Sequence, residues 1–176
     1  MNDLFVRAVR EPEIKGKAFS HERVPDGKDE WLTPPEILAA LGEFELDPCA
    51  PIIRPWPMAR RHFTRLDDGL AQRWHGRVWC NPPYGAELPK WLGRLAAHGN
   101  GIALVFARTE TRAFFDHVWP KADALLFIKG RLSFYNVDGT KSGSAGAPSV
   151  LIAYGADNAP CLESSGIAGH FLRNNG

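Results

Sequence analysis

The amino-acid sequence predicts an α/β fold, in which a mostly parallel sheet carries helices on both faces. Short apolar runs without alternation, such as "GIALVFA", recur along the chain and are typical of strands buried on both sides. Most of these runs are separated by segments with helical periodicity. The 176 residues fit one compact domain with a real hydrophobic core.

The composition is that of an ordinary globular protein, with 44% hydrophobic and 23% charged residues. The net charge of +1 means that any surface for nucleic acid must be local. Cys49, Cys80 and Cys161 are odd in number and widely spaced, which argues against a disulfide framework and fits a reducing compartment. No histidine or cysteine spacing is typical of a metal site, so we predict none.

Residues 1–30 are polar and are predicted to form a loosely held leader, with 31–176 as the single folded domain. Charges run through the first stretch, "MNDLFVRAVREPEIKG". This pattern argues against a signal peptide and against a membrane span. We therefore expect a cytoplasmic protein.

The first predicted helix covers residues 33–42. Thr33 is the expected N-cap, Pro34 suits the first helical position, and Glu36 completes a capping box. Gly42 is the expected stop.

A short strand at 44–47 should follow this helix and end at an Asp-Pro turn. Residues 51–76 are predicted to be irregular, because prolines interrupt any longer element: Pro51, Pro55 and Pro57. The buried run at 78–80 then predicts a second strand.

The second half of the chain alternates between helix and strand patterns. Helices are predicted at 87–99 and 109–122, the latter started by a Thr cap, and strands at 101–107, 124–130 and 149–155. No helix separates the last two strands, so they should form an antiparallel hairpin at the sheet edge. Their connection, residues 131–148, is predicted to be a surface loop rich in Gly and Ser, where binding work is often found.

Two polar turns should lie at the carboxyl ends of strands, where open parallel sheets bind ligands. They are "DPCA", from Asp47 to Ala50, and "NPPY", from Asn81 to Tyr84. If their strands are neighbours, the two turns line one crevice. Asp47 can accept hydrogen bonds from a cationic or hydroxyl-bearing ligand, although Asp-Pro is also a common turn starter.

The NPPY turn is suited to an amino-substituted heterocycle. Pro82 and Pro83 fix two φ angles, and Pro82 holds Asn81 in an extended conformation. The Asn81 side-chain oxygen and the Pro82 carbonyl are two acceptors for an amino group, and Tyr84 offers a flat face for stacking. The alternative is a rigid turn without function, with Tyr84 in the core or at its rim.

The order of the motifs resembles a known family. "DEWLTPPEIL", "FELDPCA", "LDDGLAQRW", "VWCNPPYG", "LVFARTETRAFF" and "FIKGRLSF" together resemble the phage-type DNA N6-adenine methyltransferase (Dam) family, from residue 29 to 155. The resemblance implies a Rossmann-like class I methyltransferase fold, S-adenosylmethionine as cofactor and DNA as partner. It also implies a bacteriophage or prophage setting in a bacterial host cell and a place in restriction–modification. The implied reaction is direct methyl transfer to adenine N6, without a covalent enzyme intermediate.

The resemblance also implies a role for individual residues toward the cofactor. Thr33 and Pro34 correspond to the motif that contacts the methionine carboxylate. Asp47 lies near the methionine amino end, and the same turn contributes Pro48, Cys49 and Ala50. Asp68 receives the adenine amino group of the cofactor, with Asp67 as the alternative and a pair of exposed turn aspartates as the other interpretation.

Toward the substrate, Asn81, Pro82, Pro83 and Tyr84 correspond to the residues that hold and stack a flipped adenine. Phe134 or Tyr135 is the candidate for the opposite side of the base. The DNA-contact candidates sit at element ends that face the crevice, and each is by itself also consistent with an ordinary solvated charge: Arg108, Arg112, Lys129, Arg131 and Lys141.

One departure stands out, because Pro51, Ile52 and Ile53 occupy positions where the family pattern has glycines. Three other interpretations remain open. The same fold can methylate cytosine N4 or a protein glutamine, the chain can be a catalytically degenerate DNA-binding relic, or it can be an α/β protein of unrelated function.

Overall fold

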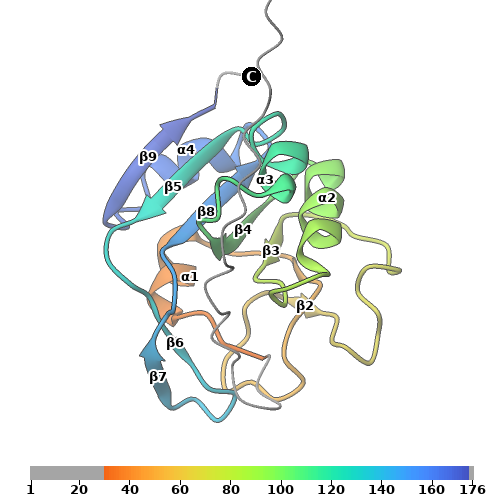
Figure 1. Cartoon of the computed structure of the whole chain (residues 1–176). Helices are drawn as coiled ribbons and strands as arrows, with labels where there is room; N and C mark the ends of the chain where they lie inside the picture. The colour runs from red at the N-terminus through yellow and green to blue at the C-terminus, as the bar shows by residue number, and fades with distance from the viewer. Residues whose placement is uncertain (1–29, 175–176) are drawn as a thin grey trace, which may run out of the picture.

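The computed structural model describes residues 30–174, so the predicted polar leader lies almost entirely outside the described residues. The described chain is an α/β structure built on a seven-stranded sheet, with a separate two-stranded hairpin (Figure 1). Its elements are α1 (Pro35–Leu41), β1 (Leu46–Asp47), β2 (Arg61–His62), β3 (Val78–Cys80), α2 (Leu88–His98), β4 (Gly101–Phe106), α3 (Arg112–His117), β5 (Ala124–Ile128), β6 (Ser133–Tyr135), β7 (Lys141–Ser144), β8 (Ser149–Tyr154), α4 (Asn158–Glu163) and β9 (Gly169–Arg173).

The sheet has the strand order β2-β1-β3-β4-β8-β5-β9. The pairs β1–β2, β1–β3 and β3–β4 are parallel, whereas β8 is antiparallel to both β4 and β5, and β9 is antiparallel to β5. The sheet is therefore mixed. Its parallel half brings β1 and β3 side by side, with Leu46 opposite Val78, so both strands end at the same edge.

Two hydrophobic clusters take alternate residues from the central strands. One includes Ile102 and Leu104 of β4 together with residues of α1 and α4. The other includes Ala103 and Val105 of β4 together with residues of α2 and α3. This alternation follows from the period of two along a strand, which sends successive side chains to opposite sides of a sheet.

The first helix begins later than the sequence pattern predicts. Its N-cap is Pro34, and no side chain caps it, so the prediction of Thr33 as N-cap is wrong. Thr33 is 1% exposed, and its hydroxyl oxygen lies 3.4 Å from the side-chain nitrogen of Asn81. The Thr33 side chain is therefore directed into the site rather than onto the helix. Gly42 does end the helix, with a φ of 79°.

Other corrections concern the irregular regions and the sheet edge. Strand β2 lies within residues 51–76, where no strand is predicted, because a polar two-residue strand has no apolar periodicity. β5 and β8 are antiparallel as predicted, but β9 occupies the edge beside β5. Residues 131–148 contain the β6–β7 hairpin rather than only a loop. α3 is shorter than the segment 109–122 predicted as helical.

The β6–β7 hairpin is attached to the segment that precedes α1. Leu32 and Tyr135 form an isolated antiparallel bridge, with N–O distances of 2.9 and 3.1 Å. The Tyr135 ring lies edge-on to Trp56, with centroids 5.3 Å apart. The hairpin is thereby attached near the end of β3, because Trp31 and Thr33, on either side of Leu32, contact Asn81.

Arg77, just before β3, joins three elements. It donates from Nε to the Asn158 side-chain oxygen of α4 at 2.7 Å, from a guanidinium nitrogen to the Leu41 carbonyl of α1 at 2.8 Å, and from the other nitrogen to the Cys161 sulfur at 3.1 Å. Its guanidinium lies 4.3 Å from the Phe44 ring centroid. Only arginine has enough N–H donors in one planar group to bond all of these acceptors at once.

Replacing Arg77 with methionine should lower the free energy of unfolding by about 3 kcal/mol, because it leaves the Asn158 side-chain oxygen without a donor and leaves the Leu41 carbonyl with only the Cys161 thiol. Urea denaturation measures this change. The matched control is Arg112→Met, since the Arg112 side chain is 93% exposed and pairs only with Asp116; a shift below about 0.5 kcal/mol is expected there. Equal effects of the two variants would contradict the structural role of Arg77.

Candidate functional site

The two polar turns predicted to form a crevice are neighbours in the structure. β1 ends at Asp47 and β3 at Cys80, and the sulfur atoms of Cys49 and Cys80 lie 3.9 Å apart. Both cysteines are free thiols, as expected. The condition for one shared crevice, that the two strands are neighbours, is therefore met.

A third loop joins the same place. A Cβ atom on Gly69 would lie 1.8 Å from the Pro48 carbonyl oxygen, so only glycine permits this contact. The Gly69 carbonyl also accepts a hydrogen bond of 2.8 Å from the buried Trp74 indole. The loop that carries Asp67 and Asp68 is therefore packed directly against the turn that follows Asp47.

Asp47 is a buried carboxyl group with little compensation for its charge. It is 2% exposed, and its Oδ1 accepts a hydrogen bond of 3.0 Å from the Cys49 backbone N–H. Burial raises the pKa of Asp47 to about 7, against the smaller opposing effects of the Cys49 hydrogen bonds and the positive charge of Arg54. Such a group favours a cationic ligand, which would hold it in the ionised form.

The Asn81 amide is oriented by its surroundings. Its nitrogen lies 3.3 Å from the Trp31 carbonyl oxygen and 3.4 Å from the Thr33 hydroxyl oxygen. A carbonyl only accepts, so the nitrogen must face Trp31 and the amide oxygen must face the other way. This oxygen is buried and has no hydrogen-bond partner among the described residues. No described residue donates to the Pro82 carbonyl either.

Tyr84 stacks on Phe106 at the end of β4. The ring centroids are 4.2 Å apart and the planes are inclined by 6°. One face of the Tyr84 ring is therefore covered within the protein. Its hydroxyl is buried without a partner in the described part of the chain, and burial raises the pKa of this hydroxyl above its ordinary value, so it stays protonated.

The two aspartates of the DDG loop differ in their surroundings. Asp67 accepts hydrogen bonds from the backbone N–H and the hydroxyl of Thr64, both at 2.8 Å, and these bonds lower its pKa. Asp68 is exposed, has a φ of 49°, and its carboxylate has no hydrogen bond or ion pair within residues 30–174. Of the two, Asp68 is the one free to bind a ligand.

The aromatic candidates of the hairpin have separate environments. Phe134 is 6% exposed and belongs to the hydrophobic core, so its ring is not presented to a ligand. Tyr135 is half-buried and adjoins Trp56. The role of these two residues toward a base stays a prediction, and Tyr135 is the better placed of them.

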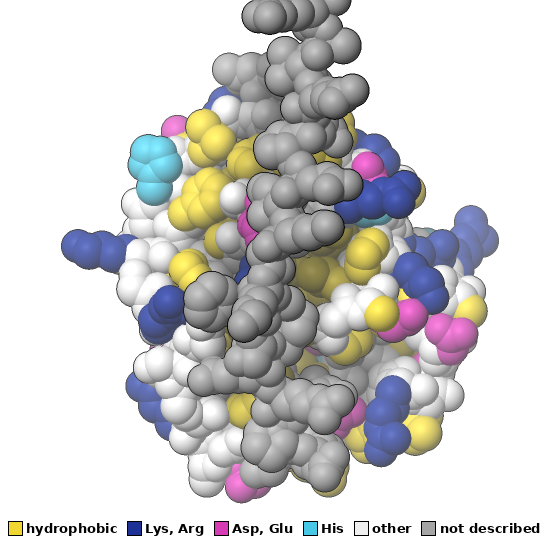
Figure 2. Space-filling model, in the orientation of Figure 1, with side chains coloured by type: hydrophobic (Ala, Val, Ile, Leu, Met, Phe, Trp, Pro, Cys, Tyr) yellow, Lys and Arg dark blue, Asp and Glu magenta, His cyan; other side chains and the backbone are white. Residues whose placement is uncertain are grey.

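The basic candidates are exposed and scattered. Arg108 lies two residues beyond Phe106, past the end of β4, and Arg131 follows β5. Neither forms an ion pair with a described residue. On the face seen in Figure 2, Lys and Arg side chains lie around the periphery rather than in one field. Their role in binding DNA stays a prediction.

Residues 51–53, at the positions where the family pattern has glycines, form a turn that is closed by the Arg54 side chain. Its guanidinium donates to the Pro51 carbonyl at 2.7 Å and to the Ile52 carbonyl at 3.4 Å. Ile52 and Ile53 are 36% and 67% exposed. These two side chains are therefore outside the core.

The chain matches the family described as DNA N-6-adenine-methyltransferase (Dam) over residues 20–162. The chain belongs to this family. As a Dam family member it is a DNA adenine methyltransferase at the level of the family, and membership implies chemistry that depends on S-adenosylmethionine. No curated protein and no solved structure matched the chain.

The described residues offer carboxylates for the ammonium and amino groups of the Dam family cofactor. An unpaired buried carboxylate at Asp47 suits an ammonium group, and the unpaired carboxylate of Asp68 suits an aromatic amino group. The residues therefore fit S-adenosylmethionine. Among residues 30–174, no cluster of three or more His, Cys, Asp or Glu residues is suited to a metal ion. None of the helices in this range has the length and apolar character needed to cross a membrane.

Several neighbours of the Dam site were not predicted from sequence. Trp31 contributes only a backbone carbonyl, which carries no residue-type signal. Phe106 is the last residue of β4, the strand next to β3. Its position at the end of a neighbouring strand could therefore have identified it as part of the site. Gly69 sits inside the predicted motif "LDDGL", and its contact with Pro48 is what brings that motif to the crevice.

Proposed function

We propose that this chain transfers a methyl group from S-adenosylmethionine to N6 of an adenine flipped out of DNA. The observation that carries the proposal is the Asn81 amide, which Trp31 orients so that its buried oxygen, without a partner among the described residues, faces the crevice. An unsatisfied buried acceptor is unfavourable unless a ligand supplies the donor. An exocyclic amino group is such a donor.

The chain's contribution to the reaction is positional and electrostatic. The Asn81 side-chain oxygen and the Pro82 carbonyl accept the two N–H groups of the target amine, which orients its lone pair toward the methyl donor. They also stabilise the positive charge that develops on that nitrogen. Bound S-adenosylmethionine supplies an electrophilic methyl group on a sulfonium.

Tyr84 is proposed to stack on the extrahelical base. Phe106 lies parallel to the Tyr84 ring and fixes its orientation, so the ring is held in place before a base arrives. Removing a base from the duplex requires a few kcal/mol of unstacking energy, which stacking on an aromatic ring offsets. Tyr135 is proposed for the opposite side of the base.

The cofactor is proposed to lie along the turns after β1 and β2. Asp47 binds the ammonium of the methionine part, Asp68 binds the adenine amino group, and Thr33 and Pro34 lie near the carboxylate. Gly69 supports this proposal, because its contact with Pro48 holds the two acidic turns in one place. The remaining turn residues, Cys49 and Ala50, form the floor between them.

The arrangement of the sheet between two helix-containing clusters supports a class I methyltransferase fold, with residues 31–176 as one domain. We propose that the protein acts in the cytoplasm of a bacterial cell, in a phage or prophage context. Protection of DNA in restriction–modification is the corresponding biological role.

The direct test is mass spectrometry of nucleosides from unmethylated DNA incubated with the protein and S-adenosylmethionine. N6-methyldeoxyadenosine is the expected product. N4-methyldeoxycytidine would identify the same fold acting on a different amine. No modified nucleoside, together with calorimetry that detects no cofactor binding, would support a degenerate DNA-binding protein instead.

A further inference from the structure

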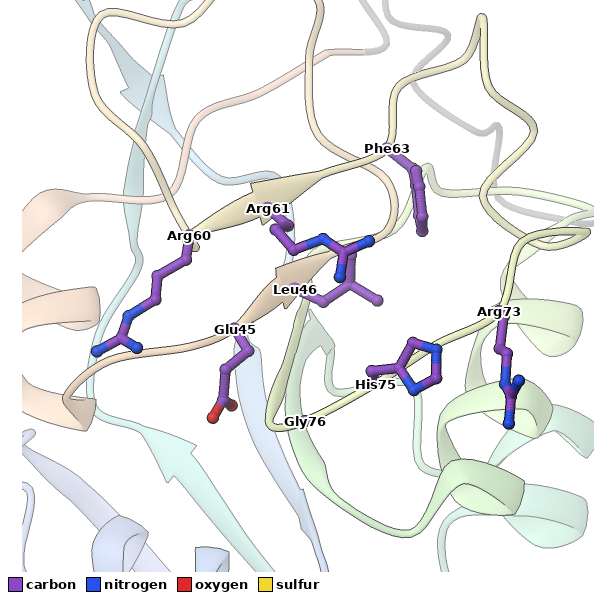
Figure 3. Close-up of a pocket in the computed structure, with 8 residues that line it drawn as sticks. All are labelled: Glu45, Leu46, Arg60, Arg61, Phe63, Arg73, His75 and Gly76. Carbon is purple, nitrogen blue, oxygen red and sulfur yellow. The ribbon is translucent and has the colours of Figure 1, made fainter.

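A pocket outside the crevice lies against the edge strand β2. It has a volume of about 310 Å³ and is lined by Glu45, Leu46, Arg60, Arg61, Phe63, Arg73, His75 and Gly76. Figure 3 shows the Arg61 side chain extending over Leu46 toward the middle of this group, with Arg60 and Arg73 on opposite sides. The lining is therefore rich in guanidinium groups.

A second pocket of about 210 Å³ shares Arg73 with the first and continues along α2. It is lined by Arg73, Trp74, Arg94, Ala97 and His98. The two pockets together form a basic groove, defined here by Arg60, Arg61, Arg73, His75, Arg94 and His98. The four arginines of this groove form an elongated row of cations, which is suited to a polyanion rather than to a single small anion.

The charge of the groove is neutralised only in part by the described residues. Glu45 is the one acidic residue in its lining, and its carboxylate accepts the backbone N–H of Arg77. Arg60 pairs with Glu43, but Arg61 and Arg73 are exposed and form no ion pair within residues 30–174. The whole chain has a net charge of only +1, so this groove concentrates positive charge locally.

The chemistry of the groove favours phosphate over bases. Guanidinium groups bind phosphate oxygens with paired hydrogen bonds. Trp74 is 6% exposed, stacks on Trp91 and is covered by the Arg94 guanidinium, so its ring is not available for base stacking. Recognition here depends on charge and is independent of base sequence.

The groove and the proposed catalytic crevice both adjoin strand β1. Leu46 lines the groove, and the next residue, Asp47, lies in the crevice. The Phe63 ring also lines the groove while its backbone N–H donates to the Asp47 carbonyl at 2.8 Å. Duplex DNA carries one negative charge per about 1.7 Å of its axis, so a duplex bound at the crevice carries a long row of phosphates on either side of the target base.

We propose that the basic groove beside β2 binds the phosphate backbone of duplex DNA next to the target base; this rests on the proposed DNA substrate. The groove supplies affinity without sequence information, and Arg61 and Arg73 are its principal contacts. It is separate from the crevice that holds the base.

The test is fluorescence anisotropy of a labelled duplex of about 20 base pairs across a range of KCl concentrations. The double variant Arg61→Gln/Arg73→Gln should bind on the order of tenfold more weakly, and the slope of log affinity against log salt should fall by about 2. Arg61→Lys/Arg73→Lys should keep the wild-type slope. Arg173→Gln is the matched control, since Arg173 lies on β9 at the opposite edge of the sheet.

A wild-type slope in the Gln variant, or no binding of the duplex by the wild-type protein, would overturn the groove proposal. Thermal unfolding of each variant establishes that it is folded. The proposed function has a separate test: it is wrong if the wild-type protein produces no methylated nucleoside. In that case the anisotropy measurement still shows whether the groove binds DNA.

Discussion

Replacing Asn81 with alanine is expected to lower the rate of methyl transfer by about 10³-fold while leaving the affinity for S-adenosylmethionine nearly unchanged. The substitution removes a buried side-chain oxygen that has no hydrogen-bond partner among residues 30–174. It leaves the turns that carry Asp47 and Asp68 untouched. The loss should therefore fall on kcat rather than on cofactor binding.

Single-turnover methylation of a saturating DNA duplex measures the chemical step, and isothermal titration calorimetry measures the cofactor affinity. Full activity of Asn81→Ala would show that the amide oxygen does not hold the target amine. A parallel loss of cofactor binding would show that the variant has disturbed the crevice as a whole, and the mechanism would then lack support.

Thr33 provides a graded companion to this experiment. Its hydroxyl lies 3.4 Å from the Asn81 nitrogen, so Thr33→Val should loosen the amide without removing it. A fall in kcat of about tenfold is expected from the loss of one hydrogen bond, with little change in KM for DNA. Thr33→Ser keeps the hydroxyl and should restore the rate.

The parts of the site that sequence reasoning located are those in which a motif follows directly on a strand. Asp47 and Asn81 each end a short buried run, and parallel strands place their ends at one edge. The assignment of the central strands and of α2 has the same basis, since their apolar periodicity is strong.

The parts that sequence reasoning missed depend on tertiary contacts with no local signal. β2 has two polar residues and exists because it pairs with β1. Thr33 had the pattern of a helix cap, but burial beside Asn81 overrode the local preference. Phe134 or Tyr135 was expected beside the base because both follow "KGR", and alternation along β6 places Phe134 in the core while Tyr135 is half-buried, a difference that the sequence alone did not indicate.

Replacing Asp47 with asparagine is expected to make the protein without cofactor more stable at pH 8, by about 2 kcal/mol, while weakening S-adenosylmethionine binding about 100-fold. Asn keeps an oxygen that can accept the Cys49 N–H but carries no charge. The stability gain arises because the buried charge is removed. The affinity loss arises because the cation of the cofactor then has no carboxylate.

The pH dependence follows from the sign of the shift. The pKa of Asp47 rises from 3.8 in the unfolded chain to about 7 in the folded protein. The folded state therefore binds the proton more tightly, and Asp47 destabilises it progressively as the pH rises from about 4 to about 7. The stability difference between Asp47→Asn and the wild type should be absent near pH 4 and full at pH 8.

Cofactor affinity of the wild type should change in the opposite sense, because only the ionised carboxylate attracts an ammonium group. Below pH 7, affinity should fall by about tenfold for each pH unit. Binding near pH 6.5 should release a proton, which calorimetry detects as a heat that depends on the buffer. Asp47→Asn should lack that buffer-dependent heat.

The two measurements on Asp47 separate a binding role from a structural one. A purely structural carboxyl group predicts that Asp47→Asn changes stability and cofactor affinity in the same direction. A carboxylate kept buried for a cationic ligand predicts opposite directions, since the charge that destabilises the free protein is the charge that binds the ligand. An Asp47→Asn variant that binds S-adenosylmethionine as tightly as the wild type would therefore remove Asp47 from the cofactor site.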